Sequence, residues 1–242
     1  MSIKDSHHGI YLLPNLFTTA SLFSAFYSIV ASLKGHYEAA VVAIFIGMIA
    51  DGLDGRIARL TNTQTDFGAQ YDSLSDMVTF GVAPSLLLYS WILHSMGKVG
   101  WLVAFMFTAS AALRLARFNI HVEDQDKRFF QGLSSPTSAA VVTSFAWMCH
   151  QYEFNNGFVL ILVAIITVIM SILMISNIRY YSFKDLDFKG KVPFLYLVIM
   201  VVLFIAIAAN PAVVLFLGFT TYALSGPVHA LWHFYDNESD DA

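Results

Sequence analysis

The sequence has few charged residues. Only 12% of its 242 residues are Asp, Glu, Lys or Arg, while 57% are hydrophobic; ordinary globular proteins carry about 25% charged residues. The charges that are present stand in clusters between long apolar runs, which excludes an ordinary soluble domain with charge spread over its surface. We therefore expect an integral membrane protein whose main solvent is the lipid bilayer.

Cysteine is nearly absent as well. The single cysteine, Cys149, excludes an intramolecular disulfide and any metal cluster built on cysteine. An isolated free cysteine in an apolar stretch usually behaves as a small buried hydrophobic residue. We therefore expect its thiol to play no part in the chemistry.

Eight stretches are candidate membrane helices, since about 20 apolar residues span a bilayer. The segments around 60–67 and 119–137 read as loops, and Asn155-Asn156-Gly157 and Asn210-Pro211 are turn signals. The first ten residues lack the features of a removable signal peptide, so we expect the first helix to remain in the mature protein. The predicted fold class is all-α, a polytopic membrane helix bundle of about eight transmembrane helices. The candidate spans are 15–33, 38–60, 67–93, 99–118, 138–152, 158–178, 192–209 and 212–232.

Lysine and arginine gather on one side of this predicted topology. Eleven of them fall on one side and two, Lys34 and Lys98, on the other. By the positive-inside rule the richer side is cytosolic, which places both termini in the cytosol. It also requires an even number of helices before the basic segment at 179–191, which supports six helices there and a C-terminal hairpin. We expect a protein of a bacterial-type inner or plasma membrane. The eleven are Lys4, Arg56, Arg59, Arg114, Arg117, Lys127, Arg128, Arg179, Lys184, Lys189 and Lys191.

Four aspartates form two helical pairs at the cytosolic ends of adjacent spans. Asp51 and Asp54 are three residues apart, and Asp72 and Asp76 are four apart, so each pair shares one helix face. Ionised carboxylates at membrane depth are costly unless a cation accompanies them. Ligation by oxygen alone suits Mg²⁺ or Mn²⁺, and four carboxylates are enough for two ions. The group contains no histidine, which argues against zinc.

Residues around the aspartates indicate a diphosphate substrate. Gly55 and Gly68 remove side chains beside the carboxylates, so a substrate can approach closely. Arg56 and Arg59 offer guanidinium groups suited to phosphate oxygens. The alternative is an interfacial salt-bridge network, and four inward carboxylates with two glycines at fixed positions favour the diphosphate site. Asp66 falls outside the pattern, and we expect a helix cap or a solvated group there.

At this spacing the sequence resembles a known family. The run Asp51-Gly52-Leu53-Asp54-Gly55-Arg56-Ile57-Ala58-Arg59, followed at fixed intervals by Gly68, Asp72 and Asp76, is similar to the complete signature of the CDP-alcohol phosphatidyltransferases. The resemblance implies an α-helical membrane enzyme, usually a homodimer, with two divalent ions in a cytosol-facing cavity. It would move a phosphatidyl group from CDP-diacylglycerol to an alcohol and release CMP; nucleic acid is not expected as a partner. The implied domains are a six-helix catalytic core at 1–191, a C-terminal hairpin at 192–235 and an acidic tail at 236–242.

The resemblance also implies separate roles for the site residues. Asp51, Asp54, Asp72 and Asp76 would hold the two metal ions, and Asp76 would in addition act as the general base. The positions that match the family's contacts with CDP-diacylglycerol are Gly55, Arg59, Gly68, Asn15 and Thr18.

Further segments resemble the phosphatidylserine synthase branch of this family. They are the runs at 13–18, 113–119, 130–136 and 176–180, so the resemblance covers about residues 10–195. The carboxylate of L-serine needs a cation, which Arg114, Arg117 or Arg179 could supply at a cytosolic helix end. Of these we favour Arg117 together with Asn119, because the pair stands at the end of a helix and a polar loop follows. Glycerol 3-phosphate would also need cations and inositol mainly hydroxyl partners, so both remain alternative acceptors.

A cation transporter with an aspartate-lined path is the alternative from another class of protein. A transport path needs polar groups spread across the bilayer. Here the outer halves of the predicted helices are almost uncharged, and the carboxylates gather near one face. This distribution favours the enzyme.

Overall fold

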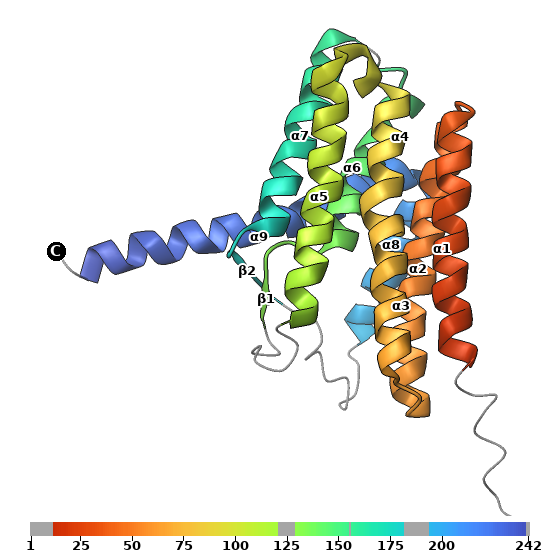
Figure 1. Ribbon diagram of the computed structural model, residues 1–242. Coiled ribbons are helices and arrows are strands. Elements are labelled where there is room, and N and C mark those ends of the chain that lie inside the picture. The colour runs from red at the N-terminus through yellow and green to blue at the C-terminus, as the bar shows by residue number, and fades with distance from the viewer. Residues whose placement is uncertain (1–11, 121–128, 155, 182–193, 241–242) are drawn as a thin grey trace, which may run out of the picture.

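The computed structural model describes residues 12–120, 129–154, 156–181 and 194–240. These ranges are almost entirely helical, which confirms the predicted all-α class. Figure 1 shows an elongated bundle with the end of the last helix running out beyond it. The α-helices are α1 (Leu12–Leu33), α2 (Tyr37–Thr61), α3 (Asp66–Asp76), α4 (Ala83–Trp91), α5 (Lys98–Ile120), α6 (Ser135–Gln151), α7 (Gly157–Ile175), α8 (Phe194–Ala209) and α9 (Pro211–Asp240).

The predicted third span is built from three consecutive helical pieces. Helix α3 leads directly into one turn of π-helix, η1 (Met77–Val82), and then into α4. A short 3₁₀ turn, η2 (Leu93–Met96), follows. Pro84 stands in the first turn of α4, where a missing backbone N–H is tolerated. The π-helical turn begins immediately after Asp76, and such turns are frequent at functional sites.

Two reversals bring α1, α2 and α3 together at one end of the bundle. Gly35 adopts a φ of 78° in the turn between α1 and α2, a conformation that glycine takes without steric cost. Helix α2 ends at a left-handed Asn62, and Thr65 caps α3 by accepting a hydrogen bond from the backbone N–H of Gly68. The predicted loop around 60–67 is thereby confirmed, and it places the end of α2 beside the start of α3.

Small and hydroxylated residues allow these helices to approach closely. A Cβ on Gly47 of α2 would lie 3.0 Å from Cγ2 of Thr79 and 3.4 Å from the carbonyl oxygen of Ser21. The hydroxyls of Ser21 and Thr79 are hydrogen-bonded at 3.2 Å, which links α1 to η1. Close contact through small residues is how membrane helices associate, because lipid removes the hydrophobic driving force between them.

Helix α6 forms much of the buried core. Its residues from Thr137 to Ala146 are buried without interruption. The hydroxyls of Thr143 and Ser144 donate back to carbonyls one turn earlier, so burial leaves them paired. The thiol of Cys149 is also buried, which confirms the expected packing role.

A short pair of strands was missed in the sequence. Strands β1 (Phe129–Gln131) and β2 (Arg179–Tyr181) pair antiparallel, with Gln131 opposite Arg179. Gly132 follows β1 with a φ of 74°, and a Cβ there would lie 2.4 Å from the carbonyl oxygen of Met174. The prediction of loop throughout 119–137 is wrong at β1, because a three-residue strand whose partner lies far along the chain has no local periodicity.

Among the described residues, four helices are long and apolar enough to cross a membrane: Leu13–Leu33, Lys98–Ile120, Gly157–Ile175 and Pro211–Ala230. Leu195–Ala209 is apolar but shorter. Helix α2 is not among them, because it carries the charges of Asp51, Asp54, Arg56 and Arg59. Helices α3 and α4 are not among them, because η1 separates them into two short helices. The structure therefore supports a membrane protein with four such helices, and the count of about eight stays a prediction.

Candidate functional site

Three of the four aspartates meet between α2 and α3. Each of Asp51, Asp72 and Asp76 offers a carboxylate oxygen, and these oxygens all lie within 4.8 Å of one another. Asp51 comes from the second half of α2, whereas Asp72 and Asp76 lie one turn apart on α3. Helix periodicity and the tight α2–α3 loop together create this cluster.

Asp54, the fourth aspartate, lies beside the cluster with 5% of its surface exposed. Its Oδ2 accepts a hydrogen bond of 2.6 Å from Oγ1 of Thr18 on α1. The Asp54 carboxylate also interacts with those of Asp51 and Asp72. The structure thus brings together all four aspartates that the sequence singled out.

The donor set fits a divalent cation. Oδ1 of Asp72 and Oδ1 of Asp76 are buried, and neither has a hydrogen-bond partner among the described residues. Buried carboxylate oxygens without partners are costly, and a cation satisfies them while it cancels their mutual repulsion. Oxygen-only ligands match Mg²⁺ or Mn²⁺. The aspartate cluster could therefore hold a metal ion.

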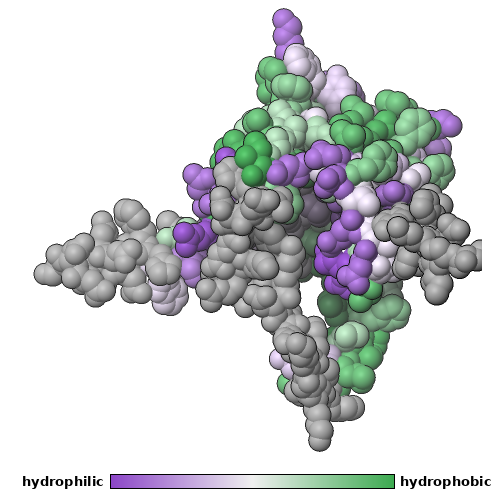
Figure 2. Space-filling model, turned by 60° about the horizontal axis from the view of Figure 1, so that its bottom comes forward, coloured by the Kyte–Doolittle hydropathy of each residue, from purple (hydrophilic) through white to green (hydrophobic). Residues whose placement is uncertain are grey.

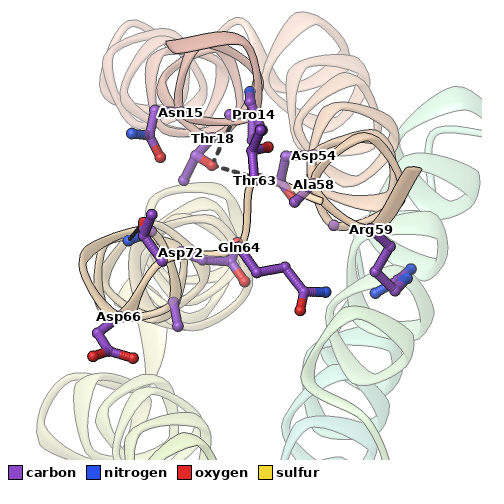
Figure 3. A pocket seen from close by; sticks show the side chains of 14 residues that line it. Pro14, Asn15, Thr18, Asp54, Ala58, Arg59, Thr63, Gln64, Asp66 and Asp72 are labelled. Atoms are coloured by element: carbon purple, nitrogen blue, oxygen red, sulfur yellow. Dashed lines mark hydrogen bonds between the residues drawn. The ribbon is translucent and has the colours of Figure 1, made fainter. Parts of the chain in front are cut away.

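A cavity of about 390 Å³ opens beside the cluster. It lies between the start of α1, the end of α2 and the start of α3, and Figure 3 shows Thr18 bonded to Asp54 with Asp72 of α3 across from them. Figure 2 looks toward this end of the bundle, where hydrophilic side chains gather. The lining residues are Pro14, Asn15, Thr18, Asp54, Gly55, Ala58, Arg59, Thr63, Gln64, Thr65, Asp66, Gly68, Ala69 and Asp72.

All five residues predicted to bind CDP-diacylglycerol line this cavity: Asn15, Thr18, Gly55, Arg59 and Gly68. The two glycines keep it open. A Cβ on Gly55 would lie 3.5 Å from Nη1 of Arg59, and a Cβ on Gly68 would lie 3.1 Å from Oγ1 of Thr65 and 3.5 Å from Oδ1 of Asn15. Substrate could thus approach the backbone at both positions.

The loop between α2 and α3 adds residues that the sequence did not assign. Thr63, Gln64 and Thr65 line the cavity because the loop folds over its edge. Asp66 is exposed in the first turn of α3, as expected for a solvated group. The helix is capped by Thr65 and not by Asp66.

Arg114 reaches the aspartate cluster from α5. Its guanidinium lies within electrostatic range of the carboxylate of Asp76 and of the phenol of Tyr222 on α9. Nη1 donates a hydrogen bond of 3.0 Å to Oγ of Ser135, the first residue of α6. Nε is buried and has no hydrogen-bond partner among the described residues. A cationic group with a free donor therefore stands next to the aspartates.

The other predicted serine contacts have different surroundings. Asn119 of α5 donates a hydrogen bond of 3.1 Å from Nδ2 to Oγ of Ser73. Ser73 is the residue that follows Asp72 on α3. Arg117 donates from Nη1 to Oδ1 of Asn177 at 3.2 Å, beyond the end of α7. Arg179 is exposed on β2. Of these residues, Arg114 lies within electrostatic range of Asp76 in the cluster, and serine binding by all four residues stays a prediction.

Two further features were not found in the sequence. The π-helical turn η1 starts directly after Asp76, and nothing in the apolar pattern marks it. Tyr222 lies on α9, more than a hundred residues from Arg114 along the chain, so no local signal connects the two. Thr18 was predicted as a substrate contact, but its hydrogen bond to Asp54 gives it a direct link to a predicted metal ligand.

Comparison with known proteins agrees with this geometry. Residues 11–170 match the family model described as CDP-alcohol phosphatidyltransferase. A Helicobacter pylori protein named CDP-diacylglycerol–serine O-phosphatidyltransferase is 38% identical over 196 residues, covering 81% of this chain and 83% of the relative. The protein of that name from Bacillus subtilis is 36% identical over 175 residues, covering 71% of this chain and 91% of the relative. The one from Methanocaldococcus jannaschii is 37% identical over 142 residues, covering 59% and 63% respectively.

Proposed function

The chain belongs to the CDP-alcohol phosphatidyltransferase family and is an enzyme, and we propose that it transfers the phosphatidyl group of CDP-diacylglycerol to the hydroxyl of L-serine. The products are phosphatidylserine and CMP. The observation that carries this proposal is the aspartate cluster at the edge of an open cavity. The names of the relatives support serine as the acceptor.

Asp51, Asp54, Asp72 and Asp76 would hold two divalent cations, Mg²⁺ or Mn²⁺. When bound, such ions neutralise the diphosphate and stabilise the charge that develops on the leaving CMP. The buried, unpartnered oxygens of Asp72 and Asp76 support this assignment. The carboxylates at one end of the bundle favour it over a transport path, which would need polar groups along the whole helix length.

The reaction we propose is a direct displacement. The serine hydroxyl oxygen attacks the phosphorus that carries diacylglycerol, and the bond from this phosphorus to the CMP oxygen breaks. Asp76 takes the hydroxyl proton as this happens. A serine hydroxyl is a poor nucleophile near neutral pH, and a positioned base typically contributes about 10²- to 10⁴-fold to the rate.

The remaining predicted residues would hold the two substrates. Gly55, Arg59, Gly68, Asn15 and Thr18 are proposed to bind the CDP part of the lipid, which is supported by their place around one cavity. The acyl chains need no pocket of their own, because they can stay in the bilayer. For the serine carboxylate, Arg114, Arg117, Asn119 and Arg179 are the proposed contacts, and the position of Arg114 beside Asp76 makes it the foremost of them.

We also propose how the protein lies in the membrane. The active site faces the cytosol and both termini are cytosolic, as the lysine and arginine distribution predicts. About eight helices cross a bacterial-type inner or plasma membrane, with a catalytic core at 1–191, a hairpin at 192–235 and an acidic tail at 236–242. The functional unit is proposed to be a homodimer.

The proposal is tested by CMP release from CDP-diacylglycerol by the purified protein in detergent micelles. We expect release that requires both L-serine and Mg²⁺ or Mn²⁺, and we expect Asp76→Asn to lose it while still binding metal. Absence of release with serine, glycerol 3-phosphate and inositol alike would overturn the proposed activity. Release with one of the other two acceptors but not with serine would overturn the choice of acceptor.

A further inference from the structure

We propose that the C-terminal helix α9 is part of the active site, and that Tyr222 is a positioning residue that holds Arg114 beside Asp76. Tyr222 lies beyond residue 170, where the match to the family model ends. The inference builds on the proposed function, because it assigns the last helix a role in binding the acceptor. It rests on how α9 is attached to the core and on what Tyr222 faces.

Helix α9 has a face made to pack on the core. Residues Ala212, Phe216, Phe219, Ala223 and Gly226 follow one another at intervals of four and three, the spacing of a helix–helix seam. Ala212 and Ala223 have no exposed surface. The ring of Phe216 lies 5.1 Å from that of Phe145 on α6, and the ring of Phe219 lies 6.3 Å from that of Phe45 on α2. The helix is therefore seated on the bundle along this seam.

Helix α8 differs in this respect. Every side chain of α8 from Leu195 to Ile205 is exposed in the single chain, and α8 packs mainly against α9. The contacts of the hairpin with the core are thus made chiefly by α9. This asymmetry points to α9 as the helix through which the hairpin acts on the site.

Tyr180 of β2 fixes α9 at the level of Tyr222. The Tyr180 side chain has 1% of its surface exposed, and its hydroxyl donates a hydrogen bond of 3.0 Å to the carbonyl oxygen of Ala223. Its ring lies 5.9 Å from the ring of Tyr222. A Cβ on Gly226 would lie 2.4 Å from Cζ of Tyr180, so no larger residue fits there without a shift of the helix or the ring.

Arg114 and Tyr222 both lie near the start of α6. Nη1 of Arg114 donates a hydrogen bond to Ser135 at the start of α6. Thr137, two residues after Ser135, lines a cavity together with Tyr222. The guanidinium of Arg114 lies within electrostatic range of Asp76 and of the phenol of Tyr222. An arginine side chain is long and flexible, and a phenol at one side limits where its guanidinium can lie. Held in this way, the buried Nε is left to donate to an acceptor carboxylate.

The test is steady-state kinetics of CMP release by Tyr222→Phe, which removes only the hydroxyl. We expect a rise of about tenfold in the KM for serine, with the KM for CDP-diacylglycerol and the unfolding temperature in detergent unchanged. Tyr196→Phe is the matched control, because Tyr196 is exposed on α8 of the same hairpin; its kinetics should equal those of the wild type.

Gly226→Ala provides a second variant that moves the helix instead of removing the hydroxyl. Its methyl group would press on the ring of Tyr180, and we expect the same selective rise in the KM for serine. A Tyr222→Phe enzyme with a serine KM within twofold of the wild type overturns the inference. Equal losses for both substrates, with a lower unfolding temperature in both variants, also overturn it, because they indicate support of the fold alone. If the wild type uses another acceptor, the proposed acceptor fails, and the role of Tyr222 is then judged by the KM for that acceptor.

Discussion

Thr18 donates a 2.6 Å hydrogen bond from Oγ1 to Oδ2 of Asp54. The backbone oxygen of Thr18 in turn accepts a hydrogen bond of 3.2 Å from Oγ of Ser75 on α3. One residue of α1 therefore contacts both aspartate-bearing helices. Partners that orient a carboxylate ligand set its direction and its affinity for metal.

Replacement of Thr18 should accordingly weaken metal binding. Thr18→Val keeps the shape but removes the donor to Asp54, and we expect a 10- to 100-fold higher metal concentration for half-maximal CMP release. Thr18→Ser keeps the hydroxyl and should stay close to the wild type. The measurement is a titration of CMP release with Mn²⁺.

The matched control is Thr19→Val. The hydroxyl of Thr19 is exposed, donates to the carbonyl oxygen of Asn15 at 2.7 Å and lies 2.9 Å from the hydroxyl of Tyr71; no aspartate in the described part of the chain is bonded to it. Its metal titration should not move. Equal titrations for Thr18→Val and Thr19→Val would show that the bond to Asp54 does not orient a metal ligand.

Removal of the proposed base should slow the chemical step. Asp76→Asn keeps the size of the side chain but cannot take up the serine proton, so we expect kcat to fall by at least about 100-fold. Glu38→Gln is the control, because Glu38 is exposed in the first turn of α2, at the other end of that helix from Asp51, and its kcat should equal that of the wild type. If Asp76→Asn retains more than about a tenth of the wild-type kcat at saturating metal, Asp76 is not the base.

Replacement by alanine should have different effects at Gly52 and at Gly68. A Cβ on Gly68 would meet Thr65 and Asn15 in the cavity wall, whereas a Cβ on Gly52 would meet nothing within 4 Å. Gly68→Ala should raise the KM for CDP-diacylglycerol by roughly tenfold, the effect of overpacking. Gly52→Ala should keep the KM and stabilise α2 by about 1 kcal/mol. Kinetics and thermal unfolding of both variants check this, and a normal KM in Gly68→Ala would argue against lipid binding at this wall.

Metal removal should affect stability as well as activity. Without a cation the four carboxylates repel one another, and a ligand that binds only the folded protein stabilises it by about 2.7 kcal/mol at 100 times its Kd. We expect chelation to abolish CMP release and lower the unfolding temperature, and Mg²⁺ or Mn²⁺ to restore both. The double variant Asp72→Asn, Asp76→Asn should unfold at the same temperature with and without metal. A wild-type unfolding temperature that is indifferent to metal would contradict the assignment of the cluster.

Local spacing explains why the aspartates could be predicted. Asp51 with Asp54, and Asp72 with Asp76, share helix faces through the helical period alone, and the short loop between α2 and α3 is marked by polar residues at 61–66. These two local facts are sufficient to bring the carboxylates together. The same loop brings Gly55, Arg59 and Gly68 to one cavity, whereas Asn15 and Thr18 reach it from α1.

Tertiary contacts explain what could not be predicted. The strands β1 and β2 lie about fifty residues apart, and each has only three residues, too few for a visible alternation. Most of α9 is apolar, so the sequence alone does not show which of its faces packs on α6. The relation of Tyr222 to Arg114 depends on this docking, so the sequence could not indicate that the last helix reaches the site.

The most direct measurement is a competition among acceptors. The purified protein is given CDP-diacylglycerol, Mn²⁺ and equal concentrations of L-serine, glycerol 3-phosphate and inositol, and the lipid products are identified by mass spectrometry. The proposed function predicts phosphatidylserine as the main product, its amount equal to the CMP released, with none formed by Asp76→Asn. A different phospholipid as the main product, or CMP release without any new phospholipid, would contradict it.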